Sequence, residues 1–499
     1  MRGRAWFRRA HACEAVTLGN PTMLGSVRSI FLRSLLLLVG SLLTTGTSAE
    51  AATELQAGGA SIIITPPVGS WQQGAGVTKR GERILDELEA NALYLNDGVT
   101  PLLLLSCDLV GLDLATVTPI RRAIAAETPV PERQVVITCT HNHSGPSLVK
   151  TNFYMPVDDA YIASLGPKLV QISKAAVASA RPVKLGWGKG RAQIGYNRRV
   201  CWEDGSHTMH GDTKRPDFAG LEGPDDPDHL AVFALDLEGR PVAVLYNNTS
   251  HPTNFYGAGL FSADYPGAAR TLLRNELGNI PVLYLNGAQG DINMANLLEA
   301  EQEDPEARMA RIGKVLAEET LRLYRQAEFH ERVPLGHEVN DLELTVRMPD
   351  PATLEEAKQV VARMEAGEMI LGMPGILAFG TVHLQETYGA NPVDTMPVHA
   401  LRIGDVALLT QPCELYCQFG IDIKRRSPTP FTAVVGLADG YCGYCPTIAG
   451  ILGGGYSGQP ISWTRLEPYA GYKLVEAAGP MLNRLWRDGK VSPDIDNEQ

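Results

Sequence analysis

Two histidines separated by a single residue, His141 and His143, follow a β-branched run that predicts a buried strand, Gln134–Thr138. In an extended chain, residues i and i+2 point to the same side, so both imidazoles can face one centre. The turn-forming sequence Ser144-Gly145-Pro146 then ends the strand. Two imidazoles on one side fit a metal ligand beside a group that handles protons, but such a pair alone is a weak signal.

Three further segments place polar side chains directly after predicted strands. His251 follows Val242–Tyr246, and Glu414 follows Val406–Thr410. The segment Asp439–Thr447 contains glycines that allow tight turns and tyrosines that can approach a centre. These segments lie tens to more than a hundred residues apart, so their spacing alone does not show that they meet.

The elements that must position these residues alternate along the chain. From residue 58, short β-branched or leucine-rich runs alternate with amphipathic stretches, which is typical of an α/β fold. The predicted strands are Ala60–Ile64, Pro101–Ser106, Gln134–Thr138, Val183–Trp187, Ala231–Leu237, Val242–Tyr246, Val282–Leu285, Val339–Val346, Val398–Ile403, Val406–Thr410 and Phe431–Gly436. The predicted helices are Ala115–Ala126, Asp159–Ala180, Tyr265–Leu277, Pro305–Arg325, Pro351–Ala366, Tyr416–Arg426 and Leu466–Arg487. We expect a mixed β-sheet core flanked by helices, with the active site in loops at strand ends.

Two segments interrupt this alternation. Residues 200–228 are rich in Asp, Gly, His and Pro, and Met364–Phe379 gathers apolar residues around glycines and a proline. The second segment is either a lid or lipid-facing surface, or a buried connection between two helices. Histidines of the first segment and its surroundings could form a second metal site, although we read them as solvated loop residues; they are His207, His210 and His229. No contextual signal marks His330, His337, His383 and His399.

The amino-terminal 49 residues predict a secretory signal peptide. Arg28 and Arg33 precede an apolar run that begins at Leu35, and small residues around Ala49 offer a cleavage site. Met23 would begin a signal of conventional length, so residues 1–22 could reflect an upstream start. The apolar run is about half as long as the ~20 residues that a membrane span needs, so we expect export, with a short membrane anchor as the alternative.

Composition limits the classes of partner. The 499 residues include 44 Lys+Arg and 56 Asp+Glu, a net charge of −12 that argues against nucleic-acid binding. Because residues 1–49 contain six Arg and one Glu, their removal would leave 38 basic and 55 acidic residues. Strong attraction to an anionic membrane is therefore not expected. Seven cysteines would remain, and their spacing does not define a disulfide pattern.

Beyond these local patterns, the sequence resembles a known family. Thr140-His141-Asn142-His143-Ser144-Gly145-Pro146 is similar to the Thr-His-Thr-His-Ser-Gly-Pro signature of the neutral, non-lysosomal ceramidases, zinc-dependent amidases that hydrolyse the N-acyl bond of ceramide. Other matching pieces follow in the family's order: Ile64-Thr65-Pro66-Pro67, Tyr196-Asn197-Arg198-Arg199, His251-Pro252-Thr253, Asn286-Gly287-Ala288-Gln289-Gly290-Asp291, Pro412-Cys413-Glu414 and Gly440-Tyr441-Cys442-Gly443-Tyr444. The resemblance implies that residues 52–499 form one ceramidase-like catalytic domain, without the family's carboxy-terminal immunoglobulin-like domain.

The resemblance also assigns roles to residues. It implies that one Zn²⁺ ion is held by His141, His251, Glu414 and Tyr444, a ligand set that suits this metal. His143 would then be the group that accepts and donates protons, and Arg198 would orient the substrate or stabilise the oxyanion. Tyr441 and Asp291 would lie at the pocket. The implied partner is a small-molecule or lipid substrate with an N-acyl group, with peripheral membrane contact as an option.

One position departs from the family. Asn293 stands where the family pattern Gly-Asp-Val-Ser-Pro-Asn has a serine that is proposed to act as a nucleophile or substrate ligand. An amide cannot form an acyl-enzyme, although it can donate a hydrogen bond to an oxyanion. We therefore expect direct attack by metal-activated water, with His143 as the base. The alternatives are a zinc-dependent esterase or other hydrolase of a non-sphingolipid substrate, and a non-catalytic ligand-binding relative.

Overall fold

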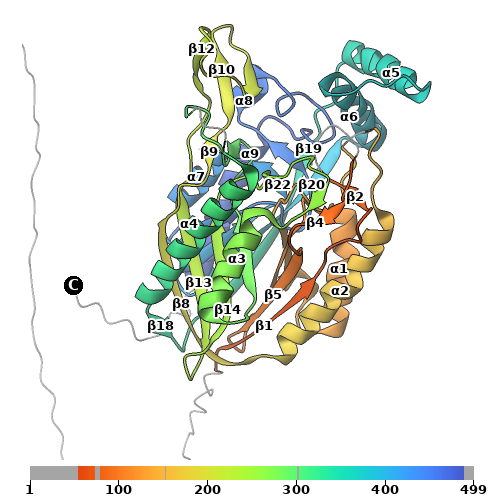
Figure 1. Cartoon of the computed structure of the whole chain (residues 1–499). Helices are drawn as coiled ribbons and strands as arrows, with labels where there is room; N and C mark the ends of the chain where they lie inside the picture. Colours follow the sequence, from red (N-terminus) through yellow and green to blue (C-terminus); the bar gives the residue numbers. More distant parts are fainter. Residues whose placement is uncertain (1–53, 74–78, 152, 300–302, 488–499) are drawn as a thin grey trace, which may run out of the picture. The chain divides into compact units, whose positions relative to one another are not determined.

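The computed structural model describes residues 54–73, 79–151, 153–299 and 303–487 (Figure 1). The predicted signal peptide, residues 1–49 with the internal start at Met23, lies outside these ranges. Within the ranges, none of the helices combines the length and the apolar character that crossing a bilayer requires.

A mixed sheet of nine strands forms the centre of the fold. In spatial order its main strands are β16 (Val282–Asn286), β14 (Pro241–Asn248), β13 (Asp228–Asp236), β8 (Arg181–Arg191), β1 (Gln56–Ile63), β5 (Glu89–Asn96), β6 (Pro101–Cys107) and β7 (Val135–Cys139), and β18 (Phe329–His330) pairs with β8. The pairs β6·β7 and β14·β16 are parallel, and the neighbouring pairs between them are antiparallel.

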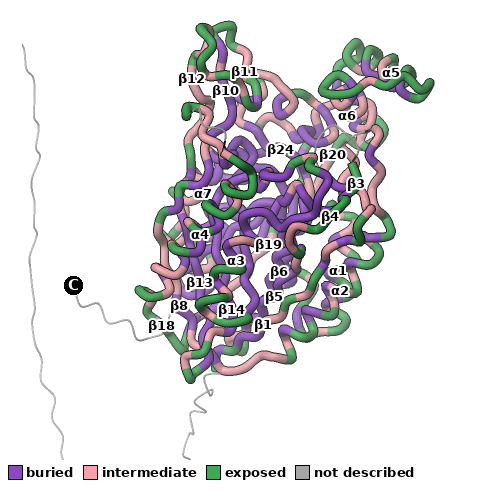
Figure 2. The backbone as a smooth tube through the Cα atoms, in the orientation of Figure 1, coloured by how far each residue is buried: buried purple, intermediate pink, exposed green. Residues whose placement is uncertain are grey.

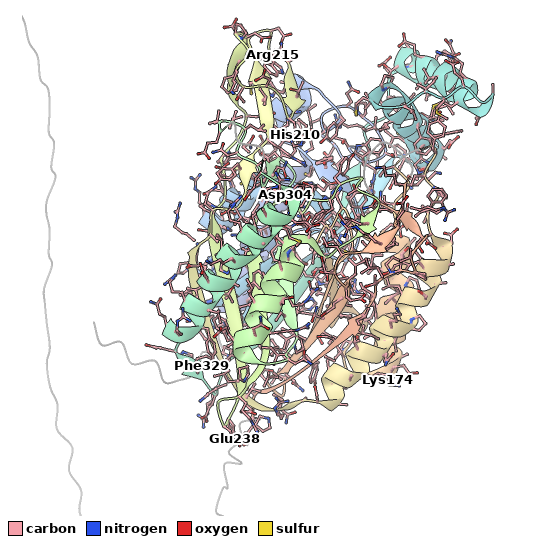
Figure 3. All side chains as sticks on the ribbon, in the orientation of Figure 1. Lys174, His210, Arg215, Glu238, Asp304 and Phe329 are labelled. Carbon is pink, nitrogen blue, oxygen red and sulfur yellow. The ribbon has the colours of Figure 1, made fainter. Side chains whose placement is uncertain are left out.

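Four helices cover one face of this sheet (Figure 1). They are α1 (Leu114–Glu127), α2 (Asp159–Ala178), α3 (Asp264–Leu277) and α4 (Pro305–Gln326). Side chains at their amino ends satisfy backbone N–H groups that have no partner within the helix. Asp304, labelled in Figure 3, accepts hydrogen bonds from two of these N–H groups at the start of α4.

The other face of the central sheet packs against a second sheet of four strands, in the order β19 (Leu335–Thr345), β20 (Val393–Ile403), β21 (Val406–Thr410) and β23 (Thr432–Val435). Two helices, α7 (Cys417–Arg426) and α9 (Ala470–Arg487), cover the outside of the second sheet. The result is a four-layer arrangement of helices, sheet, sheet and helices.

Alternation along the strands explains this layering. In β6, Leu103 and Leu105 face the helices, whereas Leu102 and Leu104 face the second sheet. Because successive side chains of a strand point to opposite faces, a strand that is apolar at every position can be covered on both sides. Figure 2 accordingly shows buried strands between outer helices whose solvent-facing sides are exposed. This is the mixed α/β architecture that the sequence predicts.

The two interrupting segments form additions to the layers. Residues of 200–228 build a small sheet from β10 (Arg199–Trp202), β11 (His207–Met209) and β12 (Phe218–Leu221). The second segment includes the end of α5 (Pro351–Glu365), a connection and the start of α6 (Met373–Tyr388). It does connect two helices, but the connection is exposed rather than buried, with Met369 75% and Leu371 50% exposed. The remaining short elements are β2 (Trp71–Gln72), β3 (Lys79–Arg80), β4 (Arg83–Ile84), η1 (Glu132–Gln134), β9 (Tyr196–Asn197), β15 (Leu260–Phe261), β17 (Ile292–Asn293), β22 (Cys413–Leu415), β24 (Gly443–Cys445) and α8 (Ile448–Gly453).

Candidate active site

Polar residues gather where the parallel strand pairs end. His141 follows β7, His251 follows β14, and Glu414 lies in β22, four residues after β21. Adjacent parallel strands present their carboxyl ends at the same edge of a sheet, which is where ligands bind in open α/β folds. The fold therefore brings together three side chains that the sequence separates by up to 273 positions.

The backbone of His141 is held in an unusual conformation. Its φ angle is 67°, in the left-handed region that residues with a Cβ atom rarely adopt. The ring Nδ1 lies 2.7 Å from the carbonyl oxygen of Val110. A carbonyl only accepts, so Nδ1 carries the proton in a neutral ring and Nε2 keeps its lone pair. The turn and the hydrogen bond together aim that lone pair into the site.

His251 has the same ring arrangement. Its Nδ1 lies 3.0 Å from the carbonyl oxygen of Ile292, and its Nε2 lies 3.1 Å from Nε2 of His141. Burial, followed by the charge of Arg198, lowers the pKa of His251 to about 3, which favours the neutral ring. The buried Asn286 links the two loops, because its Nδ2 donates to the carbonyls of Thr140 and Ser250.

Glu414 completes this arrangement from the second sheet. Its Oε2 lies 3.1 Å from His251 Nε2 and 3.3 Å from His141 Nε2. Its Oε1 accepts a hydrogen bond of 2.8 Å from the hydroxyl of Tyr441, which fixes the plane of the carboxyl group. Gly290 permits the close approach of a neighbouring loop, since a Cβ atom there would lie 2.3 Å from the carbonyl oxygen of Glu414.

These three atoms form a nearly regular triangle that fits a metal ion. Zinc bonds of 2.0–2.2 Å in tetrahedral geometry place neighbouring ligand atoms about 3.3–3.6 Å apart, and the three separations here, 3.1, 3.1 and 3.3 Å, are at or just below that range. Two imidazole lone pairs and a carboxylate oxygen at such distances repel one another unless a cation or proton lies between them. The donor set therefore fits a bound divalent metal.

His143 lies at the edge of the triangle. Its Nε2 is 3.1 Å from Nε2 of His141, and ring nitrogens of His141, His143 and His251 lie within 4.8 Å of one another, a group that could hold a metal ion. Burial and the neighbouring His141 lower the pKa of His143 well below its ordinary value. Its Nδ1 is buried and has no hydrogen-bond partner among the described residues, so Nε2 is the nitrogen that His143 presents to the triangle.

Arg198 and Tyr444 stand on the opposite side of His251. Nη2 of Arg198 lies 2.9 Å from His251 Nε2 and 3.3 Å from the hydroxyl of Tyr444. Glu414 and Tyr444 are register partners in the parallel pair β22·β24, which places them side by side. Burial and the charge of Glu414 raise the pKa of Tyr444 well above its ordinary value, so its hydroxyl is protonated at neutral pH.

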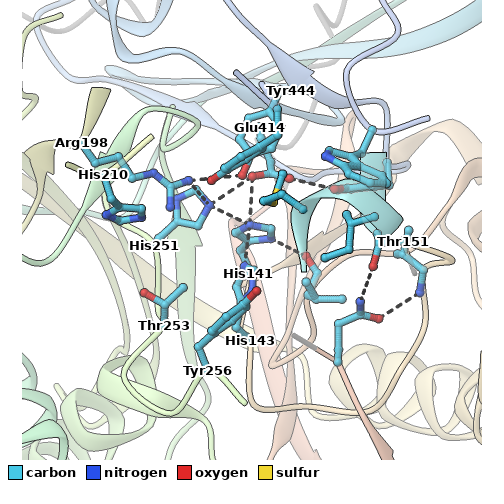
Figure 4. A pocket seen from close by; sticks show the side chains of 18 residues that line it. His141, His143, Thr151, Arg198, His210, His251, Thr253, Tyr256, Glu414 and Tyr444 are labelled. Atoms are coloured by element: carbon cyan, nitrogen blue, oxygen red, sulfur yellow. Dashed lines mark hydrogen bonds and ion pairs between the residues drawn. The ribbon is translucent and has the colours of Figure 1, made fainter. Parts of the chain in front are cut away.

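A cavity of about 370 Å³ opens onto this cluster (Figure 4). Its size is within the range of small-molecule sites. One part of the wall is apolar, and among its lining residues are Val110, Val149, Met373, Ile376 and Trp463. The polar and aromatic lining residues are Gln73, His141, His143, Thr151, Arg198, His210, His251, Thr253, Tyr256, Glu414, Tyr441, Tyr444 and Tyr456. Glu414 is the one acidic residue in the lining that the described chain provides.

Two residues proposed at the pocket lie behind its surface. Asp291 is buried and accepts hydrogen bonds from Asn197 Nδ2 and from the backbone N–H of Cys417, so it joins β9 to the start of α7. Burial raises its pKa to about 7. The described lining residues include neither Asp291 nor Asn293. Thr253, which does line the cavity, donates a hydrogen bond to Oδ1 of Asn293.

Several lining residues carried no role in the sequence reasoning. Thr253 and Tyr256 follow His251 within five positions, so their proximity to the site could have been inferred from that motif. Tyr456 and Trp463 come from the carboxy-terminal region, which offered no such motif. The start of α6 contributes Met373 and Ile376, which belong to Met364–Phe379, the segment with a lid as one of its two interpretations.

The other histidines are dispersed. His210 reaches the cavity from the small added sheet, and Figure 3 shows it closer to the body of the fold than Arg215. His207 lies 2.7 Å from Glu222, and His229 lies 2.8 Å from Thr320 beneath α4. These separate partners do not create a second metal site from the three histidines.

Comparison with known proteins identifies the fold. No family model matches the sequence, and no curated protein is significantly similar to it. Among solved structures, the chain matches one described as a ceramidase complexed with C2, with a TM-score of 0.66, 17% identity, and coverage of 89% of this chain and 77% of that one. It also matches neutral ceramidase from Pseudomonas aeruginosa, with a TM-score of 0.64, 18% identity and the same coverages.

Proposed function

We propose that this chain, which shares the fold of neutral ceramidase, is a zinc-dependent hydrolase that cleaves the amide bond of an N-acylated, ceramide-like substrate. The observation that carries the proposal is the triangle of His141 Nε2, His251 Nε2 and Glu414 Oε2 at the base of the cavity. Both ring orientations are fixed by backbone carbonyls, as is usual for histidines that bind metals.

The residues around the triangle suit amide hydrolysis. A bound zinc ion would lower the pKa of a water molecule and polarise the substrate carbonyl. His143, whose lowered pKa favours the neutral ring and whose Nε2 faces the triangle, would accept the proton of the attacking water and return it to the departing amine nitrogen. Arg198 supplies a positive charge beside His251 that can stabilise the developing oxyanion. Tyr444 lies within reach of the same guanidinium group.

The cavity supports an acyl substrate. Val110, Val149, Ile376 and Trp463 give it an apolar wall that can receive a hydrocarbon chain by the hydrophobic effect. The charged and hydrogen-bonding groups are concentrated at the histidine cluster, where the scissile bond must lie. A chain with a net charge of −12 has little electrostatic attraction for anionic lipid, so the substrate would enter through apolar contact.

Metal content and turnover test the proposal together. Purified protein should contain one zinc ion per chain and hydrolyse N-acyl amides of short or long chain length, and His143→Gln should retain the zinc while losing about 10²–10⁴-fold in kcat. Hydrolysis of esters alone would favour the esterase. One zinc ion per chain without turnover of any acyl substrate would instead indicate a ligand-binding protein.

We also propose that the protein is exported through residues 1–49 and that residues 52–499 act as one catalytic domain. The support is the basic, apolar and small-residue order of that leader. Mass spectrometry of protein secreted by an expression host should find an amino terminus near residue 50. An uncleaved chain retained in membranes would support the alternative anchor.

A further inference from the structure

Thr253 is one of two threonines in the lining of the cavity, and it belongs to the loop that carries His251. It lies two residues after His251, lines the cavity, and points to the same side of the cluster as Tyr256 in Figure 4. Two contacts fix its position, because His251 Nδ1 lies 3.0 Å from the carbonyl of Ile292 and Thr253 Oγ1 lies 3.2 Å from Oδ1 of Asn293. The loop that holds Thr253 is therefore attached to β17 at two successive residues.

The direction of the Thr253 hydrogen bond follows from the backbone. Oδ1 of Asn293 also accepts the N–H of Met294 at 2.9 Å, and an N–H group must face an oxygen, which fixes the orientation of the amide. Thr253 consequently donates its single hydroxyl hydrogen to Asn293. Toward the cavity the hydroxyl can offer only lone pairs, so it can only accept a hydrogen bond.

We propose that Thr253 determines specificity for secondary amides by accepting a hydrogen bond from the N–H of the scissile amide. This inference rests on the proposed function and narrows its substrate class. An ester places an oxygen lone pair where the amide has its N–H, and a tertiary amide places a carbon there. Either would leave the lone pairs of Thr253 without a donor, and unpaired polar groups in a binding site discriminate strongly between substrates.

Asn293 acquires a role through this contact. It does not line the cavity, and it acts as a positioning residue that holds the hydroxyl hydrogen of Thr253 away from the substrate. Asn293 cannot follow the family's serine route, and through this hydrogen bond it determines that the Thr253 hydroxyl accepts rather than donates a hydrogen bond on the substrate side.

The test measures kcat/KM for a secondary amide, its N-methyl derivative and the ester with the same acyl chain. The parent should prefer the secondary amide to its N-methyl derivative. Thr253→Val should reduce the ratio of amide to ester kcat/KM by at least about tenfold, the size expected for one lost hydrogen bond, and Thr253→Ser should restore the ratio. Thr118→Val makes the same chemical change in α1, outside the lining of the cavity, and should leave the ratio unchanged.

A second variant keeps the test independent of how well Thr253→Val folds. Asn293→Ala frees the hydroxyl hydrogen to turn toward the substrate, so it should also reduce the amide-to-ester ratio. Zinc content and thermal unfolding of each variant identify any that fail to fold. If parent protein cleaves amides and the ratio is the same in Thr253→Val and Asn293→Ala, the inference about Thr253 is overturned while the proposed function stands. If the parent cleaves no amide, the proposed function itself fails, and this inference fails with it.

Discussion

In the described part of the chain, two groups combine two histidines with a buried carboxylate, and they differ in whether they are arranged for a metal. In the first, His141 and His251 direct the same kind of nitrogen, Nε2, at one oxygen of Glu414. In the second, His337, His399 and Asp439 form a row, with His337 Nε2 3.0 Å from His399 Nδ1 and His399 Nε2 3.3 Å from Asp439 Oδ2.

The difference lies in where the protons can go. In the row, Nε2 of His337 and Nδ1 of His399 can share one N–H, so this pair of neutral rings needs no cation. Nε2 of His399 and Oδ2 of Asp439 make no hydrogen bond among the described residues, although they lie 3.3 Å apart. In the triangle, backbone carbonyls take the N–H groups of both rings, so both Nε2 atoms present lone pairs, and the guanidinium group of Arg198 lies 2.9 Å from that of His251. The first group also opens to the cavity, whereas His399 and Asp439 are fully buried. Residue types alone therefore do not identify a metal site. What identifies it is the hydrogen-bond partner of the ring nitrogen that does not face the metal.

The largest expected effect comes from removing a ligand of the triangle. His251→Ala should abolish zinc retention and reduce kcat/KM by at least about 10³-fold, because the metal and the alignment of Arg198 are lost together. Zinc measured by mass spectrometry after dialysis checks this result. His337→Ala, which removes a histidine from the row, should keep one zinc ion per chain. Full retention of metal by His251→Ala would contradict the ligand assignment.

A smaller loss is expected from the residue that joins the two histidine loops. Asn286→Ala removes hydrogen bonds to the carbonyls of Thr140 and Ser250, so zinc affinity should fall about 10–100-fold, as is typical of groups that orient metal ligands. Competition with a chelator gives the affinity. Asn340→Ala, at an exposed position of the strand that carries His337, is the matched control. Equal zinc affinity in both variants would argue against this positioning role.

Substitution within the row should affect stability and leave the metal in place. His399→Leu removes the Nδ1 that lies 3.0 Å from Nε2 of His337, and loss of a partner for a polar group withdrawn from water costs about 1–3 kcal/mol. Urea denaturation would show a lower midpoint with an unchanged slope. A variant that lost zinc at unchanged stability would show that the row and the triangle are coupled and that the row also contributes to metal binding.

The smallest expected effect is on the pH dependence of the free energy of unfolding. Burial, followed by the charges of Arg121 and Arg133, lowers the pKa of His337 to about 4, below the ordinary value of about 6.5. Between those values the unfolded chain binds a proton that the folded chain does not, so this group destabilises the fold as the pH falls. Asp439 acts in the opposite sense, because burial raises its pKa to about 6 and the folded carboxyl binds a proton first.

His337→Gln removes the histidine contribution and retains that of Asp439. Its free energy of unfolding should therefore fall less than that of the parent between about pH 6.5 and pH 4. Histidines of the triangle contribute to both proteins and cancel in the difference. Parallel curves for parent and variant would show that His337 has no depressed pKa in the folded chain.

Much of the layer structure could be predicted from local patterns. Strand β21 is observed at the predicted bounds of Val406–Thr410, and α4 extends the predicted Pro305–Arg325 by one residue. Strand β5 was not predicted, because Glu89–Asn96 contains two alanines and two leucines that suit a helix equally well. The helix α6 was missed for the opposite reason, since its glycines suggest a loop, whereas Gly380 permits contact with Trp463.

The site was only partly accessible from the sequence. Each of His141, His251 and Glu414 could be placed at a strand end, but their convergence depends on two sheets packing face to face, which no spacing encodes. Histidine enters the left-handed region more often than most residues with a Cβ atom, but this preference does not single out His141 among the histidines of the chain. In the sequence, Asn293 is marked by its departure from the family serine, whereas Thr253 carries no such mark. Only the structure shows that Thr253 is the one of the two that lines the cavity.

Anomalous diffraction at the zinc absorption edge, from crystals of protein supplied with zinc, tests the central claim most directly. We expect one strong peak bounded by Nε2 of His141, Nε2 of His251 and the carboxyl group of Glu414, and none at His337 and His399. A peak at the row, or no peak at the triangle in a protein that is folded and saturated with zinc, would contradict it.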